Sequence, residues 1–198
     1  MTAVLLALLT ALAAGLRHAL EPDHMGAVTT FVSRGARPLQ ALGFGVRWGL
    51  GHSLAILAVG SVLIVLDLDV PEGFARGLEF GVGAMLLGLG LWLLWSLLHE
   101  GAHQRMDPGA DRHTDHGGRV TGWVGVAHGL AGTAPLIGIL PVALIESPLL
   151  AAGYLLLFGV GTVLAMGAYA WIIGLVFHHS AHRSRGLARG LRAATALG

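Results

Sequence analysis

The sequence predicts an all-α fold, a polytopic transmembrane helical bundle, and three observations support this prediction. Hydrophobic residues make up 55% of the 198 positions and charged residues only 12%, with a mean hydropathy of +0.73, whereas soluble domains are about a quarter charged. The apolar residues form long segments, and the arginines gather in alternate connections between them. The absence of cysteine excludes disulfides and thiolate metal sites. A near-neutral net charge of +1 without basic tracts excludes a nucleic-acid partner.

Five segments are long and apolar enough to cross a bilayer core, which requires about 20 residues per helix. They are residues 3–33, 39–66, 74–98, 121–145 and 148–177. The first carries charged residues around Pro22, and proline removes a helical hydrogen bond, so we expect a kink or a break there. We expect the final residues LRAATALG to begin a sixth span that stays incomplete.

The arginine pattern predicts the orientation in the membrane. Arginines lie in every second connection and in the tail, at Arg34, Arg37, Arg105, Arg112, Arg119, Arg183, Arg185, Arg189 and Arg192. The connections DLDVPEG and IESP contain acids and no arginine. By the positive-inside rule the N-terminus is outside and the C-terminus inside, in the cytoplasmic (inner, plasma) membrane. We expect no cleaved signal peptide, because a basic n-region is missing and apolar residues resume after His24.

Ionisable residues inside the expected spans form the candidate site. In the first, second and fourth of these spans they are Arg17, His18, Glu21, Asp23, His24, Arg47, His52 and His128. Each costs about 2.5–3.5 kcal/mol on insertion scales, so such groups face the protein interior and mark function by default. The alternative to a functional role is that a histidine only makes a hydrogen bond between helices. This alternative explains a lone histidine such as His52 equally well, but it explains the whole set less well. We expect Arg17 and Arg47 to pair with Glu21 or with lipid phosphate.

The spacing of His18, Asp23 and His24 predicts a metal site only if the helix is broken. On an intact helix Asp23 and His24 would lie about 140° and 120° around the axis from His18. A break at Pro22 would let them turn back towards His18, as in the discontinuous helices that hold ions in transporters. Imidazole favours zinc, copper, iron or nickel over magnesium or calcium. We therefore predict metal ligands at His18, Asp23 and His24, with His52 and His128 as nearby ligands or gating donors.

Two further histidine-rich stretches are weaker candidates for metal binding. The first lies in the connection 99–120 and the second follows the last span; together they contain His99, His103, His113, His116, His178, His179 and His182. Short histidine-rich tracts indicate metal binding by composition alone. A solvated polar loop explains them as well, because acids, arginines and glycines are interspersed.

The motif residues resemble a known family. RHALEPDH, with His18, Asp23 and His24, resembles the H-x4-D-H signature of the nickel/cobalt transporter superfamily. GLGHSLAIL, with His52, is similar to the second histidine motif of that superfamily. HALEPDH early in the chain and AHGLAGTAPL later look most like the UreH-type urease accessory membrane proteins. The resemblance implies that His18, Asp23 and His24 recognise and transport the metal.

A weak internal similarity predicts an inverted repeat within a single transmembrane domain, 1–198. HALEPDHMGAV and HGLAGTAPLIG begin three expected spans apart and, by the arginine pattern, run in opposite directions. We expect residues 1–98 to form the first repeat, 99–120 a histidine-rich cytoplasmic loop, and 121–198 a second, incomplete repeat.

These observations predict a membrane transporter of a divalent transition-metal cation, Ni²⁺ or Co²⁺, that serves the maturation of a metalloenzyme such as urease. The metal is a transported ligand, and we expect no prosthetic group. Expected partners are the lipid bilayer and the metal ion, with a cytoplasmic metallochaperone and a second copy of the chain as further candidates.

Two other classes stay open, and an enzyme is not expected. One is a non-transporting accessory membrane protein that holds metal or docks a metallochaperone through the histidine-rich loop. The other is an exporter of metal or of a small anion, with Arg17 and Arg47 as anion contacts. An enzyme is not expected because no serine or cysteine nucleophile lies beside a base.

Overall fold

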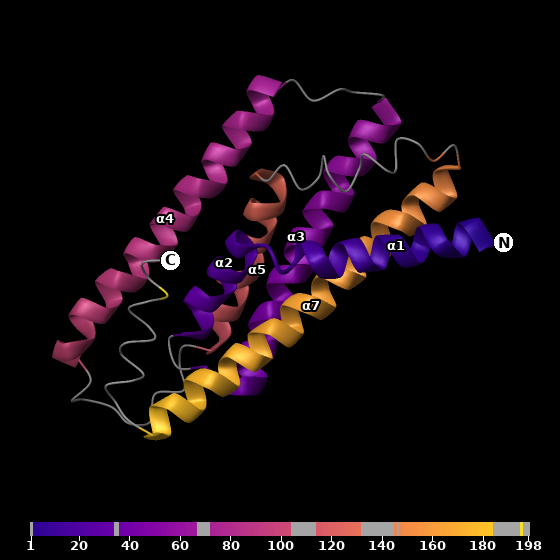
Figure 1. Cartoon of the computed structure of the whole chain (residues 1–198). Helices are drawn as coiled ribbons and strands as arrows, with labels where there is room; N and C mark the ends of the chain where they lie inside the picture. The colour runs from indigo at the N-terminus through magenta and orange to yellow at the C-terminus, as the bar shows by residue number, and fades with distance from the viewer. Residues whose placement is uncertain are drawn as a thin grey trace.

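The computed structural model describes residues 2–33, 36–66, 72–103, 114–131, 145, 147–183 and 195 (Figure 1). This part of the chain contains six helices and no strand. The helices are α1 (Thr2–His18), α2 (Pro22–Val32), α3 (Pro38–Leu66), α4 (Glu72–His103), α5 (Thr114–Ala131) and α7 (Pro148–Arg183). The all-α class predicted from the sequence is confirmed for these residues.

Proline is the first residue of three of these helices, at Pro22, Pro38 and Pro148. Proline suits the first helical position because its missing N–H has no helical partner there and its φ is already helical. The residue before α2, Glu21, is extended with φ −69° and ψ 144°, as the residue before a proline prefers. The motif proline therefore ends one helix and starts the next.

The predicted interruption of the first span is confirmed. α1 and α2 are bent by 57° across a short break at residues 19–21. The backbone of the break stays hydrogen-bonded, with Leu20 N–H donating to Arg17 O at 3.0 Å and Glu21 N–H to His18 O at 3.0 Å. This matters because an unpaired backbone group in a bilayer costs several kcal/mol.

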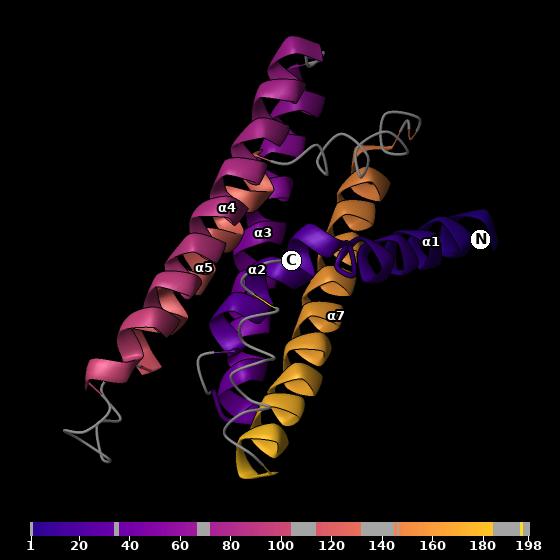
Figure 2. The same cartoon turned by 60° about the vertical axis from the view of Figure 1, so that its left-hand side comes forward.

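The helices pack around α3, which lies against both α5 and α7. Figures 1 and 2 show α1 crossing α7 at a steep angle, with its N-terminus projecting from the bundle. α2 lies among α3, α4, α5 and α7, and α4 lies at one edge against α2 and α5. Leu20 and Glu21 in the break are exposed, whereas the histidines on either side of it, His18 and His24, are buried in the bundle.

Glycines allow α5 to approach the middle of α3 closely. A Cβ built on Gly125 would overlap the carbonyl of Trp48, and one on Gly129 would lie 2.6 Å from the carbonyl oxygen of His52. Such backbone-to-backbone approach is typical of helix pairs in membranes. It places α5 directly beside the segment of α3 that contains His52.

Three described helices are long and apolar enough to cross a membrane, or four if α1 and α2 count as one broken span. They include residues of α3, α4 and α7, with hydropathies of 1.4, 1.9 and 2.1. The chain is thus an integral membrane protein built of helices. Of the predicted fourth span, 121–145, α5 covers only the first part and is not among these candidates; residues 132–144 lie outside the described part of the chain.

Several helix ends differ from those expected from hydropathy. α4 continues to His103 and α5 begins at Thr114, so both ends of the expected loop 99–120 are helical. α7 extends beyond residue 177 to Arg183. A helix satisfies its own backbone hydrogen bonds whatever the side chains are, so it does not stop where the apolar run stops. The expected sixth span falls on residues outside the described ranges, apart from residue 195, and the incomplete repeat stays a prediction.

Candidate metal centre

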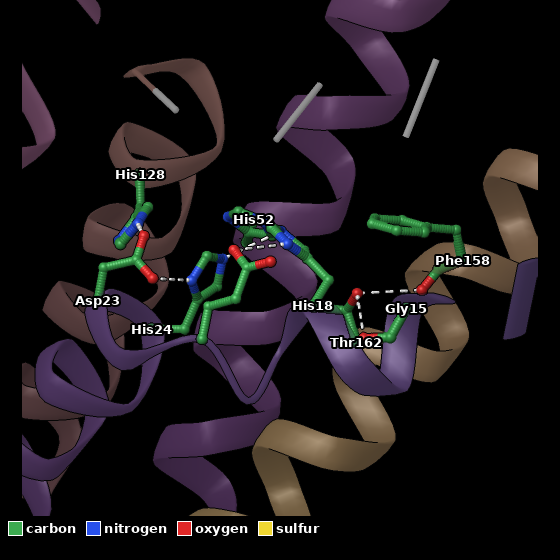
Figure 3. Close-up of polar contacts among 9 residues, drawn as sticks. Gly15, His18, Asp23, His24, His52, His128, Phe158 and Thr162 are labelled. Atoms are coloured by element: carbon green, nitrogen blue, oxygen red, sulfur yellow. Dashed lines mark hydrogen bonds and ion pairs between the residues drawn. The ribbon is translucent and has the colours of Figure 1, made fainter. Parts of the chain in front are cut away.

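The break between α1 and α2 brings the two motif histidines together. His18 is the last residue of α1, and His24 lies in the first turn of α2. Their Nε2 atoms lie 3.1 Å apart, although the residues are six positions apart in the chain (Figure 3). The convergence expected from a break at Pro22 is therefore present for these two side chains.

A third imidazole comes from α3. The Nε2 atom of His52 lies 3.2 Å from that of His18, so three Nε2 atoms meet. Ligand atoms of these three histidines lie within 4.8 Å of one another, and all three residues are buried. We name His18, His24 and His52 the inner group. Three imidazole nitrogens around one point are the donor set of many transition-metal sites.

In two of these rings, His18 and His24, the other ring nitrogen, Nδ1, is hydrogen-bonded to a carboxylate. His24 Nδ1–H donates to Asp23 Oδ1 at 2.7 Å, and His18 Nδ1–H donates to Glu21 Oε2 at 3.1 Å. A neutral imidazole that donates from Nδ1 presents only a lone pair at Nε2. Metal-binding histidines are usually oriented in this way by a carboxylate or a carbonyl. Both Nε2 atoms are thus acceptors, although they lie only 3.1 Å apart.

No carboxylate orients His52; its ring is positioned by packing and by the contact of its Nε2 atom with His18. Its ring stacks on Trp48, four residues earlier in α3, at a centroid distance of 4.8 Å and an interplanar angle of 11°. Its Nδ1 atom is buried without a hydrogen-bond partner, as is Trp48 Nε1. On the opposite side of the cluster, Phe158 of α7 lies 5.3 Å from the ring of His18. Aromatic rings therefore form the apolar walls of the inner group.

Asp23 joins the inner group to α5. Its Oδ2 atom accepts a hydrogen bond from His128 Nε2 at 3.0 Å, while its Oδ1 atom accepts from His24. Figure 3 shows this carboxylate between the two imidazoles. Asp23, His24 and His128 form a second group whose ligand atoms lie within 4.8 Å of one another. We name it the outer group, because the side chain of Asp23 is 34% exposed.

The cluster lies deep in the membrane-spanning region. His52 is near the middle of α3, a helix of 29 residues, which places it about 21 Å from either end at 1.5 Å per residue. Buried ionisable groups at such a depth mark ion or substrate pathways by default. The carboxylates Glu21 and Asp23 add negative charge beside the histidines, which favours a cation.

All five residues predicted as metal ligands or gating donors belong to this cluster. The other histidines do not: His99, His178 and His179 are exposed and lie outside both groups. His103, His116 and His182 lie in helical segments whose side chains are not described, and His113 lies outside the described residues. Arg17 and Arg47 are exposed, and neither hydrogen-bonds to the histidines of the cluster.

The contacts that two residues make in the site, Glu21 and Trp48, were not predicted from the sequence. Glu21 was expected to pair with Arg17 or to leave it to lipid, but its carboxylate contacts His18. Its position three residues after His18 was the available signal, because residues three apart are neighbours on a helix face. Trp48 lies one helical turn before His52 and was not among the candidate residues.

The fold and the cluster define a helical membrane protein with a buried site of imidazole and carboxylate donors. No family model and no solved structure matches the chain. It is 34% identical over 181 residues to the urease accessory protein UreH of Bacillus sp. (strain TB-90), covering 86% of this chain and 77% of that protein. The chain belongs to the UreH family, as its motif residues predicted.

Two plant proteins are more distant relatives. They are the chloroplast proteins FOR GROWTH AND FERTILITY 2 and 1 of Arabidopsis thaliana, 29% identical over 185 residues and 28% over 187 residues. The chain spans 48% of the length of each. The bacterial relative is named a urease accessory protein.

Proposed function

We propose that this protein transports a divalent transition-metal cation, Ni²⁺ or Co²⁺, across the cytoplasmic membrane, and that the inner group binds the ion on its way. The ion is the cargo of the protein and not a resident cofactor. Membership of a urease accessory family supports a role in supplying metal to an enzyme such as urease.

The observation that carries this proposal is the meeting of two lone pairs at 3.1 Å. Nε2 of His18 and Nε2 of His24 both face one another as acceptors, because each ring donates its Nδ1 proton to a carboxylate. Two neutral acceptors at this distance repel unless a positive charge, a metal ion or a shared proton, lies between them. Three nitrogens that bind one tetrahedral ion at about 2.0–2.1 Å lie about 3.4 Å apart. The observed separations of 3.1 and 3.2 Å are already close to that geometry.

The test is accumulation of radioactive nickel by nickel-starved cells that express the wild type, His18→Ala, Asp23→Asn or His24→Ala at matched membrane levels. We expect the wild type to raise accumulation and each variant to abolish the increase. His99→Ala is the matched control, because His99 is an exposed histidine outside both groups. A wild type that lowers accumulation through the same residues would instead indicate export.

A non-transporting accessory role is the second candidate, and the name of the bacterial relative favours it. In that case the protein would hold metal or dock a metallochaperone without moving ions. Equal accumulation by the wild type and all variants would support this role over transport. An anion exporter has less support, because Arg17 and Arg47 are exposed, whereas the histidines of the cluster are buried.

A further inference from the structure

The imidazole of His24 belongs to both donor groups. Its Nε2 atom faces His18 in the inner group, and its Nδ1 atom faces Asp23 in the outer group. An ion bound to one nitrogen of this ring would therefore lie on the opposite side from an ion bound to the other. The same ring can serve two ion positions in turn.

The two groups differ in access and in charge. The inner group has three imidazoles, and the side chains of His18 and His24 are only 7% and 2% exposed. The outer group has a carboxylate that is 34% exposed, beside His128, which is 1% exposed. Asp23 is the one negatively charged residue of the two groups, so a cation that sheds its water gains a charged ligand in the outer group; the carboxylate of Glu21, which is 48% exposed, contacts His18 but belongs to neither group. The outer group is thus the accessible position and the inner group the enclosed one.

The surroundings of His128 also point to a ligand role. Its Nε2 atom contacts Asp23, but its Nδ1 atom is buried with no hydrogen-bond partner. Leaving a buried polar atom unpaired costs about 1–3 kcal/mol. If His128 served only to orient Asp23, a side chain with one donor and no second buried nitrogen could do so without this cost. A role that needs an imidazole at this place accounts for it.

We propose that the cluster contains two successive ion positions, an outer one at Asp23, His24 and His128 and an inner one at His18, His24 and His52. This inference rests on the proposed transport function and adds the order in which the ion occupies its binding positions. With the ion in the inner position, the single proton of neutral His24 lies on Nδ1 and is donated to Asp23. With the ion in the outer position, that proton lies on Nε2 and is donated to His18. In the same exchange the proton of His128, which lies on Nε2 and is donated to Asp23 when the outer position is empty, lies on Nδ1 when the ion is bound there. His24 and His128 each keep one proton throughout, and only its place in the ring changes.

The experiment separates nickel binding from nickel movement in the full-length protein. Equilibrium dialysis of the detergent-solubilised protein against NiCl₂ gives the Kd, and proteoliposomes give the nickel uptake rate at saturating nickel. For His52→Ala we expect a Kd at least tenfold weaker than that of the wild type. For His128→Ala we expect a Kd within threefold of the wild type but an uptake rate at least tenfold lower. His99→Ala should match the wild type in both measurements.

His128→Gln keeps a donor for Asp23 without an imidazole, and it replaces His128→Ala if that variant fails to fold. We expect its uptake rate to stay at least tenfold below that of the wild type. Restored uptake in His128→Gln would overturn the outer position, since His128 would then only orient Asp23. Equal losses of Kd in the variants of His52 and His128 would also overturn it, in favour of a single site. A wild type that neither binds nor moves nickel would instead reject the proposed function itself.

Discussion

In each imidazole of the cluster, the environment of one nitrogen decides what the other can do. His18 and His24 are each fixed by a carboxylate, whereas His52 is fixed by stacking on Trp48. Hydrogen-bonded partners of this kind set both the tautomer and the ring orientation of a metal ligand. Substituting the residues that orient the ligands therefore tests the metal site as directly as substituting the ligands themselves.

Replacing Glu21 by Gln should weaken nickel binding about tenfold, the lower end of the range for losing such a partner. The negative charge beside His18 would be lost, and the amide oxygen of glutamine is a weaker acceptor for its Nδ1–H than the carboxylate. Isothermal titration calorimetry of the purified protein measures the effect. Glu79→Gln is the control, because Glu79 is exposed on α4. An unchanged affinity in Glu21→Gln would show that Glu21 does not orient His18.

The sequence predicted the identity of the cluster better than its internal geometry. Pro22 predicts a break in the helix. A break is enough to expect that the side chains of His18 and His24 turn towards each other. The sequence cannot show that Asp23 turns its carboxylate to Nδ1 of His24 and to His128, leaving the Nε2 atoms to meet. That arrangement depends on side-chain rotamers and on the placement of α5. Neither can be deduced from the spacing of these residues along the sequence.

At the level of helices, the crossing of α3 and α5 places His128 within reach of Asp23. The crossing depends on Gly125 and Gly129, whose missing side chains let the two backbones touch. Hydropathy predicted α3 and α7 well, because both are apolar over most of their length. It did not predict this contact, because glycines occur throughout the chain and only some of them face a backbone.

Gly129→Ala should destabilise the protein by about 1–3 kcal/mol, the usual cost of overpacking. Its added methyl would lie 2.6 Å from the carbonyl oxygen of His52, a backbone atom that cannot move aside alone. The melting temperature in detergent should fall, and nickel uptake should fall with it as His128 moves away from Asp23.

Gly83→Ala in α4 is the matched control for this substitution, because nothing lies within 4 Å of its added Cβ. Alanine also favours a helix over glycine, so the stability of this variant should be unchanged or slightly raised. Equal melting temperatures for Gly129→Ala and the wild type would show that α3 and α5 do not touch at this point.

At the scale of the whole molecule, the sequence predicts how the protein is oriented in the membrane. Because the chain contains no cysteine, single cysteines can be introduced to test this orientation. The arginine pattern predicts that Thr2 is outside and His179 inside, and both residues are exposed. A membrane-impermeant maleimide should label Thr2→Cys in intact cells. It should label His179→Cys only after the cells are permeabilised. The reverse pattern would contradict the predicted orientation.

The single break between α1 and α2 also places two opposite partial charges at the site. The C-terminal end of a helix carries about −0.5 elementary charge and the N-terminal end about +0.5, from the aligned peptide dipoles. α1 ends at His18, so its negative pole favours the bound cation. α2 begins at Pro22, so its positive pole favours the ionised carboxylate of Asp23 in its first turn. A continuous helix would offer neither pole at this depth, and the interruption supplies both from backbone alone.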